Sequence, residues 1–269
     1  MTRQVHPVYI MNLLFIGDIF GEPGRQAVQD ILPKLRRERR IDVVVANGEN
    51  VAHGKGITAK TAEQLFAAGV DVITTGNHAY DQHEVHDYFK RQPRLLRPEN
   101  FPAVSPGRGY AVIEVYAGVQ LAVLNLIGQI HMEAADSPFA AADRALAELK
   151  GRADVVFVDM HAEATSESRA MGWHLDGRVA AVLGSHTHVQ TADEEILPKG
   201  TAYLTDAGMT GPYRSIIGMK LDNVLRKFQT GIKSRFEPAD GDVRFCGAIV
   251  EIEESTGLAR KIERVQIRL

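Results

Sequence analysis

The chain has very little cysteine and no long apolar run. Cys246 is the only cysteine among 269 residues, which excludes an intramolecular disulfide and any metal site built from several cysteines. It lies in an apolar, strand-like run, Val243 to Ile252, so we expect a buried structural thiol. The first apolar run, Leu13 to Ile16, is far too short to cross a bilayer, and no signal-peptide pattern precedes it. We therefore expect a cytoplasmic protein with no membrane partner.

A strong charge of either sign is also missing. The formal net charge is -3, which gives no sign of a general affinity for nucleic acid. Basic residues cluster only between Lys34 and Arg40, where a solvated helix end is the expected explanation. The length suits one large domain with a substantial core. We predict a single domain over residues 1–269, with residues 1–10, which precede Met11 and carry little pattern, as a disordered extension or tag remnant.

Short apolar runs that stop abruptly at a polar residue recur along the chain. Their length and nearly continuous hydrophobicity are typical of strands buried on both faces. The runs are Asn12–Gly17, Ile41–Gly48, Val70–Gly76, Val155–Met160, Ala180–Gly184 and Thr201–Thr205.

Helix-like segments alternate with several of these runs. Apolar residues recur at helical spacing from Pro23 to Arg39. The stretch Thr61–Gln64 has capping-box spacing and opens a helix that Gly69 can close. Ser137-Pro138 has the pattern of an N-cap and first-turn proline for a helix from Phe139 to Leu149. The alternation implies parallel strands joined by crossover helices.

Two hairpins interrupt this alternation. One joins Tyr110–Tyr116 to Val119–Ile127, and the other joins Val243–Glu253 to Leu258–Leu269. We therefore predict an α/β fold in which two mixed β-sheets pack together and helices flank them, a four-layer α/β/β/α sandwich.

Ligand-type side chains follow most of the predicted strands. Ligands of an α/β sheet bind beyond the carboxyl ends of its parallel strands, so these side chains should converge. Any one of them alone has an ordinary explanation, such as a helix cap or a hydrogen-bonded core histidine. Five strand ends that all deliver oxygen or imidazole ligands instead indicate a site for divalent transition metals. The residues are Asp18, Glu49, Asn50, Asn77, His78, His161, His186 and His188.

These strand ends resemble the successive motifs of the calcineurin-like metallophosphoesterases, in the correct order between residues 12 and 210. The motifs are Gly17-Asp18, Gly48-Glu49-Asn50, Gly76-Asn77-His78, His161 and Gly184–His188. The stretches Gly48–Thr58 and Asp206–Pro212 resemble more narrowly the YmdB-like bacterial cyclic-nucleotide phosphodiesterases. The resemblance implies a metallophosphoesterase-like form of the four-layer sandwich and a homo-oligomer.

The chain departs from the broad superfamily pattern at three positions. Phe20 stands where a histidine ligand is usual, Glu49 replaces the usual bridging aspartate, and Ala79 replaces an acidic residue. The YmdB-like branch shares these departures. There Asn50 fills the coordination gap left by the lost histidine.

The resemblance further implies two divalent metal ions, with Fe or Mn expected first and Zn or Mg as alternatives. Glu49 would bridge the two ions. The remaining ligands would be Asp18, Asn50 and His188 for the first ion, and Asn77, His161 and His186 for the second. Such ions, roughly 3.5–4 Å apart, lower the pKa of a bridging water, and the resulting hydroxide attacks phosphorus. His78 would act catalytically by protonating the leaving alkoxide.

Three further residues are candidates for binding substrate. Glu163 and Thr165 follow His161 closely, although helix capping explains them equally well, and Thr210 lies in the second YmdB-like stretch.

The function predicted from the sequence is therefore a dinuclear-metal phosphodiesterase that hydrolyses 2′,3′- or 3′,5′-cyclic nucleotides. A phosphomonoesterase or a nuclease would use the same site. Nucleic acid is expected only as RNA from which a substrate is derived. A metal-containing regulatory or RNA-binding protein, and a nucleotide-binding α/β domain without metals, are the alternatives from other classes.

Overall fold

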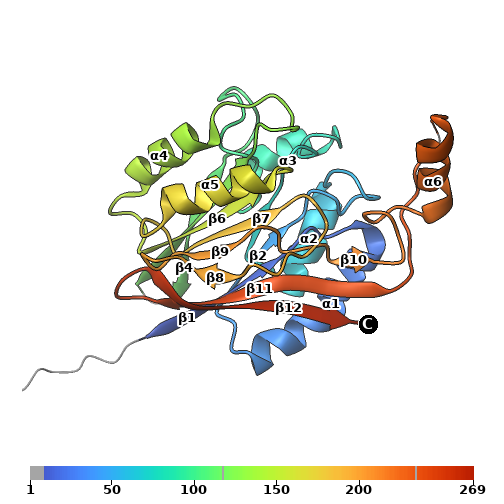
Figure 1. The fold of residues 1–269 in the computed structure, drawn as a ribbon. Coiled ribbons are helices and arrows are strands. Elements are labelled where there is room, and N and C mark those ends of the chain that lie inside the picture. Colours follow the sequence, from blue (N-terminus) through green and yellow to red (C-terminus); the bar gives the residue numbers. More distant parts are fainter. Residues whose placement is uncertain (1–8, 117, 234) are drawn as a thin grey trace, which may run out of the picture.

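A computed structural model describes residues 9–269 apart from residues 117 and 234. Two six-stranded sheets pack face to face, and helices cover the outer face of each (Figure 1). The predicted α/β sandwich of two mixed sheets flanked by helices is confirmed.

The first sheet has the strand order β10-β11-β1-β2-β3, and β12 pairs with β11 outside this path. Its strands β1, β2 and β3 are parallel, whereas β11 runs antiparallel to β1, β10 and β12. The bounds are β1 (Ile10–Ile16), β2 (Val43–Asn47), β3 (Val72–Thr74), β10 (Gly211–Pro212), β11 (Val243–Glu253) and β12 (Leu258–Arg268). The predicted second hairpin is therefore present.

The second sheet has the order β4-β5-β6-β7-β9-β8. Its central strands β5, β6, β7 and β9 are parallel, and the two edge strands are antiparallel to their neighbours. The bounds are β4 (Tyr110–Tyr116), β5 (Val119–Ile127), β6 (Val155–His161), β7 (Ala181–Ser185), β8 (Glu195–Ile196) and β9 (Ala202–Leu204).

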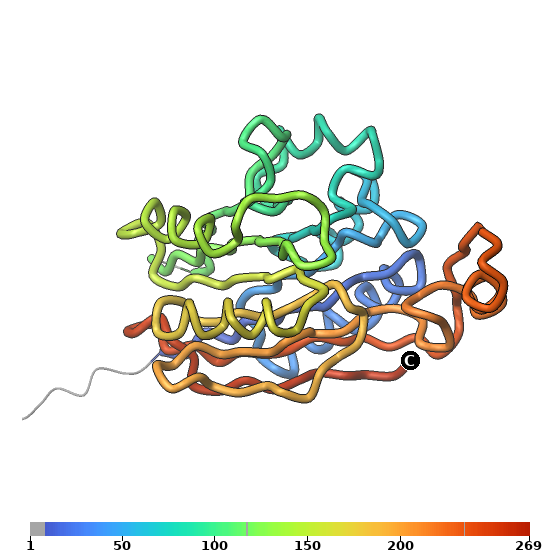
Figure 2. The backbone as a smooth tube through the Cα atoms, turned by 45° about the horizontal axis from the view of Figure 1, so that its top comes forward, coloured from blue at the N-terminus to red at the C-terminus, as the bar shows by residue number. Residues whose placement is uncertain are grey.

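Among the described residues, five helices pack on the sheets and a sixth stands away from them. α1 (Gly21–Glu38), α2 (Ala59–Ala68) and α3 (Val85–Arg91) cover the first sheet, and α4 (Pro138–Leu149) and α5 (Thr165–Leu175) cover the second. α6 (Leu221–Thr230) projects from the body of the molecule (Figures 1 and 2). None of the helices within the described residues has the length and apolar character of a membrane span.

Three apolar cores separate the four layers. In β1, Leu14 and Ile16 face the helices, while Leu13 and Phe15 face the second sheet. The Phe15 ring meets the Phe157 ring of β6 at 5.2 Å between centroids. Because both faces of the sheets are covered, their strands are apolar without alternation, and this produced the continuous runs in the sequence.

Helix ends largely follow the predicted caps, with one correction. The helix α2 begins earlier than expected, because Thr58 is its N-cap and forms a capping box with Thr61. Thr61 is therefore the third residue of the helix rather than its cap. Gly69 closes α2 with a φ of 107°, and the Ser137 side chain accepts a hydrogen bond at the start of α4, as predicted.

The N-terminal prediction needs a second correction. Ile10 pairs with Glu253 in the first sheet, so it belongs to β1 and not to an extension. This pairing adds residues before the expected strand start at Asn12. Residues 1–8 of the predicted extension lie outside the described part of the chain.

Gly184 in β7 provides a stability test of the strand packing that positions the site. A Cβ at this position would lie 1.7 Å from the carbonyl oxygen of Thr205, a backbone atom that a rotamer change cannot move. We expect Gly184→Ala to lower the free energy of unfolding by about 3 kcal/mol or more, measured by urea denaturation. Gly151→Ala is the control: its Cβ would meet open space, and its φ of 74° should cost about 1–2 kcal/mol. Equal losses would contradict the packing argument.

Candidate metal centre

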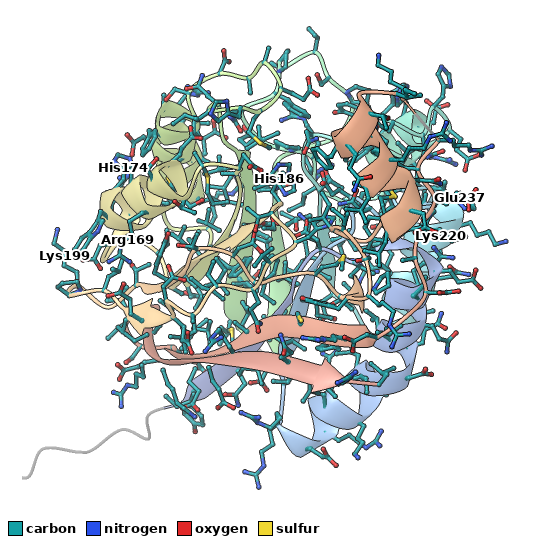
Figure 3. All side chains as sticks on the ribbon, turned by 45° about the vertical axis from the view of Figure 1, so that its right-hand side comes forward. Arg169, His174, His186, Lys199, Lys220 and Glu237 are labelled. Atoms are coloured by element: carbon teal, nitrogen blue, oxygen red, sulfur yellow. The ribbon has the colours of Figure 1, made fainter. Side chains whose placement is uncertain are left out.

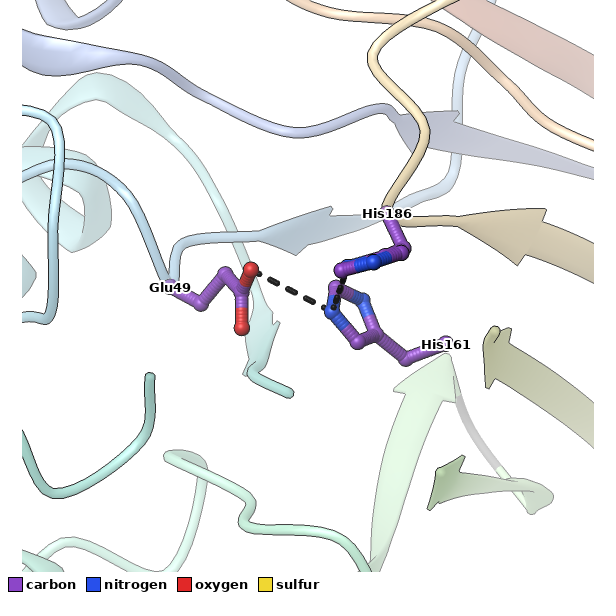
Figure 4. Close-up of side chains that lie close together, drawn as sticks. All are labelled: Glu49, His161 and His186. Atoms are coloured by element: carbon purple, nitrogen blue, oxygen red, sulfur yellow. Dashed lines mark hydrogen bonds and ion pairs between the residues drawn. The ribbon is translucent and has the colours of Figure 1, made fainter. Parts of the chain in front are cut away.

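The ligand-type side chains predicted from the sequence meet at the carboxyl ends of strands from both sheets. Glu49 follows β2 of the first sheet, whereas His161 ends β6 and His186 follows β7 of the second. One ligand atom from each of these three residues lies within 4.8 Å of the others. Figure 4 shows their side chains directed at one another across the gap between the sheets.

Glu49 occupies the centre of this cluster. Its Oε1 lies 3.2 Å from His161 Nε2 and accepts a hydrogen bond of 3.1 Å from Asn50 Nδ2. Its Oε2 accepts a hydrogen bond of 3.2 Å from the backbone N–H of His78. Glu49 thus contacts residues that follow β2 and β3 and the residue that ends β6.

The remaining expected ligands are linked to Glu49 through His161 and Asn50. His161 Nε2 lies 3.1 Å from both Asn77 Oδ1 and His186 Nδ1, and His188 Nε2 lies 3.1 Å from Asn50 Nδ2. Asp18 Oδ2 accepts a hydrogen bond of 2.9 Å from the backbone N–H of His186. Six of the seven side chains expected to bind metal are therefore connected by side-chain contacts, and Asp18 joins them through the backbone of His186.

The charges of the cluster follow from its burial. Burial alone would raise the pKa of Glu49 and lower that of His161, but their mutual attraction outweighs this effect. The pKa of Glu49 is therefore lowered, and that of His161 is raised to about 9. Burial lowers the pKa of His186 to about 3 and also lowers that of His188. These two imidazoles are neutral at pH 7, which is the form that binds metal ions.

Asp18 provides a test of whether the cluster suits a cation. The side chain is fully buried, and its Oδ1 has no hydrogen-bond partner among the described residues. Burial, followed by the neighbouring carboxylate of Asp206, raises the pKa of Asp18 well above its ordinary range. A buried carboxylate with an unpaired oxygen is costly unless a positive charge compensates it. The donor set of carboxylates, amides and imidazoles fits a divalent transition metal.

A buried network holds the ring of His161. His161 Nδ1 lies 2.9 Å from Ser185 Oγ, which donates a hydrogen bond of 2.7 Å to Asp159 Oδ1. Asp159 Oδ2 accepts further hydrogen bonds from Thr74 and Asn47. Because Nδ1 is engaged on this side, Nε2 faces Glu49, which is the arrangement by which outer groups orient a metal-binding histidine.

The two histidines of the H-x-H motif diverge because they lie in a turn. His186 and His188 have φ values of 110° and 64°. Thr187 lies between them, and both its backbone N–H and its hydroxyl donate hydrogen bonds to Asp206 Oδ2. His186 contacts His161, whereas His188 contacts Asn50. The two rings can therefore serve different ions.

His188 is supported by two groups that are not ligands. Its Nδ1 donates a hydrogen bond of 2.9 Å to the carbonyl oxygen of Ile217. Ile217 has a φ of 47°, which is uncommon and strained for a β-branched residue. The buried ring of Phe20 packs edge-on against the His188 ring, 5.5 Å away. Phe20, which stands where the superfamily usually has a ligand, is thus an apolar support for a neighbouring candidate ligand.

His78 lies beside the cluster with its own partner. Its Nδ1 lies 2.9 Å from Asp81 Oδ2, and the same oxygen lies 3.0 Å from Lys55 Nζ. Asp81 therefore fixes one edge of the imidazole, and the other nitrogen, Nε2, is left near Asn77 at 3.4 Å.

The cluster opens into a cleft of about 450 Å³. Glu163 lines this cleft and pairs with His186 Nε2 at 3.2 Å, so it lies where a substrate-binding residue was expected. Thr165 and Thr210 do not line the cleft. Thr165 is exposed at the start of α5. The hydroxyl of Thr210 is buried in hydrogen bonds to the backbone of Cys246, so the structure gives no support to a substrate contact at either threonine.

The model of the YmdB-like protein family matches residues 14–265. The chain belongs to this family. It is 47% identical over 257 residues to a protein of Bacillus subtilis named 2′,3′-cyclic-nucleotide 2′-phosphodiesterase, covering 96% of this chain and 97% of the relative. The family predicted from the motifs is therefore confirmed, and so is the class of phosphodiester hydrolase.

Two solved structures share the fold of this YmdB-like chain. A hypothetical protein from Thermus thermophilus has a TM-score of 0.90 and 44% identity, over 96% of this chain and 99% of that one. A protein from Mycoplasma pneumoniae described as a novel phosphatase has a TM-score of 0.92 and 33% identity, over 97% and 95%.

Several residues that support the site were missed in the sequence. Asp81, Ser185 and Ile217 contact His78 or a candidate ligand directly, and Asp159 contacts Ser185; none of the four was expected to do so. Asp159 did leave a signal, because it is a charged residue inside an otherwise apolar strand. Ile217 left none, since it acts through its backbone carbonyl.

The support given by Phe20 predicts a large stability effect. Phe20 is 2% exposed and Phe228 is 75% exposed. We expect Phe20→Ala to lower the free energy of unfolding by about 3–5 kcal/mol, because the cavity cannot close around the lost ring. Phe228→Ala is the matched control and should change it by less than about 0.5 kcal/mol. Chemical denaturation of both variants without added metal measures the difference. A small loss in Phe20→Ala would show that the ring does not support the site.

Proposed function

We propose that this YmdB-like chain is a dinuclear-metal phosphodiesterase that hydrolyses cyclic nucleotides, with the 2′,3′-cyclic isomer as its main substrate. The observation that carries the proposal is the connected cluster of seven ligand-type side chains around Glu49, open to a cleft that His78 also lines. The name of the Bacillus subtilis relative supports the 2′,3′ isomer. Activity on 3′,5′-cyclic nucleotides and the expected homo-oligomer stay predictions.

The proposed ligand assignment gives Glu49 the bridging position between two divalent ions. Asp18, Asn50 and His188 would hold one ion, and Asn77, His161 and His186 the other. The contacts of Glu49 support this division, because its Oε1 touches Asn50 of the first set and His161 of the second. We expect Fe or Mn first, with Zn or Mg as alternatives, since a mixed N/O donor set accepts several divalent metals.

Bound metal ions would polarise the phosphoryl group and lower the pKa of coordinated water. The chain itself brings little positive charge to a phosphate, because Lys227 is the only lysine or arginine among the residues that line the cleft. The protein residues instead hold the ligand atoms in place. Ser185 and Asp159 orient His161, and Ile217 orients His188.

His78 would supply the proton that the leaving ribose oxygen needs. His78 would do so as an imidazolium, in which Asp81 accepts from Nδ1–H and Nε2 carries the second proton. As the oxygen leaves phosphorus, the Nε2 proton would pass to it and leave a neutral ring protonated at Nδ1, a step that contributes most when the leaving group is a strong base.

Hydrolysis by metal-loaded protein is the first test. The protein is loaded with Mn²⁺ or Fe²⁺, its bound metal is measured by elemental analysis, and turnover is followed with 2′,3′-cAMP, 3′,5′-cAMP and bis-p-nitrophenyl phosphate. We expect turnover of 2′,3′-cAMP with about two metal ions per chain. Glu49→Gln should lose about 10³-fold or more of kcat, because it removes the proposed bridge. The exposed Glu38→Gln on α1 is the matched control and should keep full activity. Metal-free protein, or full turnover in Glu49→Gln, would overturn the proposal.

The leaving group provides a second test, specific to His78. We expect His78→Ala to lower kcat for 2′,3′-cAMP by about 10²–10⁴-fold, since a ribose alkoxide needs a proton to leave. The loss with bis-p-nitrophenyl phosphate should be much smaller, because p-nitrophenolate is a weak base and leaves unaided. Equal losses with both substrates would contradict the role of an acid. Hydrolysis of phosphomonoesters in preference to diesters would instead favour a phosphatase.

A further inference from the structure

The cleft has a second wall that the proposed chemistry does not use. In the same cleft as the ligand cluster, the described residues of the segment 213–242 around α6 contribute apolar side chains and one cation. We call these apolar residues the α6 wall: Ile216, Ile217, Met219, Val224, Phe228 and Phe236. The cation is Lys227, which lies in the same part of the cleft. One cleft thus combines a polar, ligand-rich side with an apolar side.

The base of the segment that carries the α6 wall is closed by contacts within the segment. At the base of the segment, Lys220 and Glu237 form an ion pair of 2.8 Å, and the backbone N–H of Lys220 donates to the Glu237 carbonyl. Figure 3 shows these two residues close together beneath α6. The backbone N–H of Ala239 donates to Gly218, next to Ile217. Since Ile217 also accepts from His188, the wall is connected directly to the ligand cluster.

The aromatic residues of the wall are presented for contact. Phe228 is 75% exposed although it lines the cleft. Lys227 Nζ lies 5.0 Å from the centroid of the Phe236 ring, so a cation–π contact holds the ammonium over that ring. Phe236 itself is half-buried. An exposed ring at Phe228, with Phe236 and the Lys227 ammonium beside it, is suited to a ligand that joins a flat, apolar group to an anion.

We propose that the α6 wall binds the nucleobase of the substrate by stacking, chiefly on Phe228 and Phe236; this inference rests on the proposed function. In a 2′,3′-cyclic nucleotide only the ribose separates the base from the phosphate. A phosphate at the ligand cluster therefore leaves the base within the same cleft. The cleft volume lies within the range of small-ligand sites.

The composition of the α6 wall also determines its selectivity. Every base has a π-face, so stacking tolerates all of them. Lys227 is the only side chain with a hydrogen-bonding group that α6 places in the cleft. The enzyme should therefore accept all four bases and discriminate against compounds that lack a base.

The experiment compares two substrates that differ only in the base: 2′,3′-cAMP and ribose 2′,3′-cyclic phosphate. In metal-loaded enzyme, we expect Phe228→Ala and Phe236→Ala each to lower kcat/KM for 2′,3′-cAMP by roughly 5- to 150-fold, the loss typical of one stacking contact. The abasic substrate should react unchanged. Phe228→Trp should retain activity on 2′,3′-cAMP, because an indole also stacks. Leu225→Ala is the matched control, since Leu225 is 43% exposed on α6 and does not line the cleft.

The outcomes separate this inference from the proposed function. If wild-type enzyme hydrolyses neither substrate, the proposed function fails and the inference fails with it. If it hydrolyses both equally well, or if the alanine variants lose activity equally on both, the α6 wall does not bind the base and the function stands. Unchanged kinetics in both alanine variants would overturn the inference in the same way. Because Phe228 is exposed, its variants should fold normally, which circular dichroism verifies.

Discussion

The contact between Glu49 and His161 joins the two sheets at their common edge, and the rest of the site is arranged around it. Glu49 belongs to the first sheet and His161 to the second. A buried carboxylate and imidazole stabilise each other only when their separation is accurate. The core between the sheets, where Phe15 meets Phe157, sets that separation. Packing between the two sheets therefore sets the position of the two groups at the centre of the site.

The fold was predictable where one local pattern decided the structure. Strands buried on both faces gave continuous apolar runs, and Gly69 gave a helix end. The helix α5 was missed because Gly172 interrupts its helical pattern. Packing requires this glycine, since an added Cβ would lie 2.5 Å from the Tyr203 ring. Tertiary packing thus overrides helix propensity at this position. The helix α6 did carry a signal, since Leu221, Val224 and Phe228 recur at helical spacing, but it lies outside the strand–helix alternation from which the fold was predicted.

The same distinction applies to the site. Candidate ligands were predictable because parallel strands bring their ends together, so position in the chain was enough. The residues that orient those candidate ligands were harder to predict, because they lie on other parts of the fold than the ligands they orient. Asp159 reaches His161 only through Ser185 of the next strand. The strained backbone of Ile217 reaches His188 from the segment that carries the α6 wall, and its side chain gave no indication of that role.

Phe20 has a consequence for how this metal site can change by mutation. Its ring fills the space above Gly54 and Gly218, where an added Cβ would lie 2.6 Å from the ring in each case. Both glycines have positive φ, so neither accepts a larger residue easily. A histidine reintroduced at position 20 would enter a pocket shaped for a phenyl ring, while Asn50 already contacts both Glu49 and His188. A histidine at position 20 alone would therefore leave the Asn50 contacts in place, so the side chains at positions 20 and 50 have to change together to restore the superfamily ligand set.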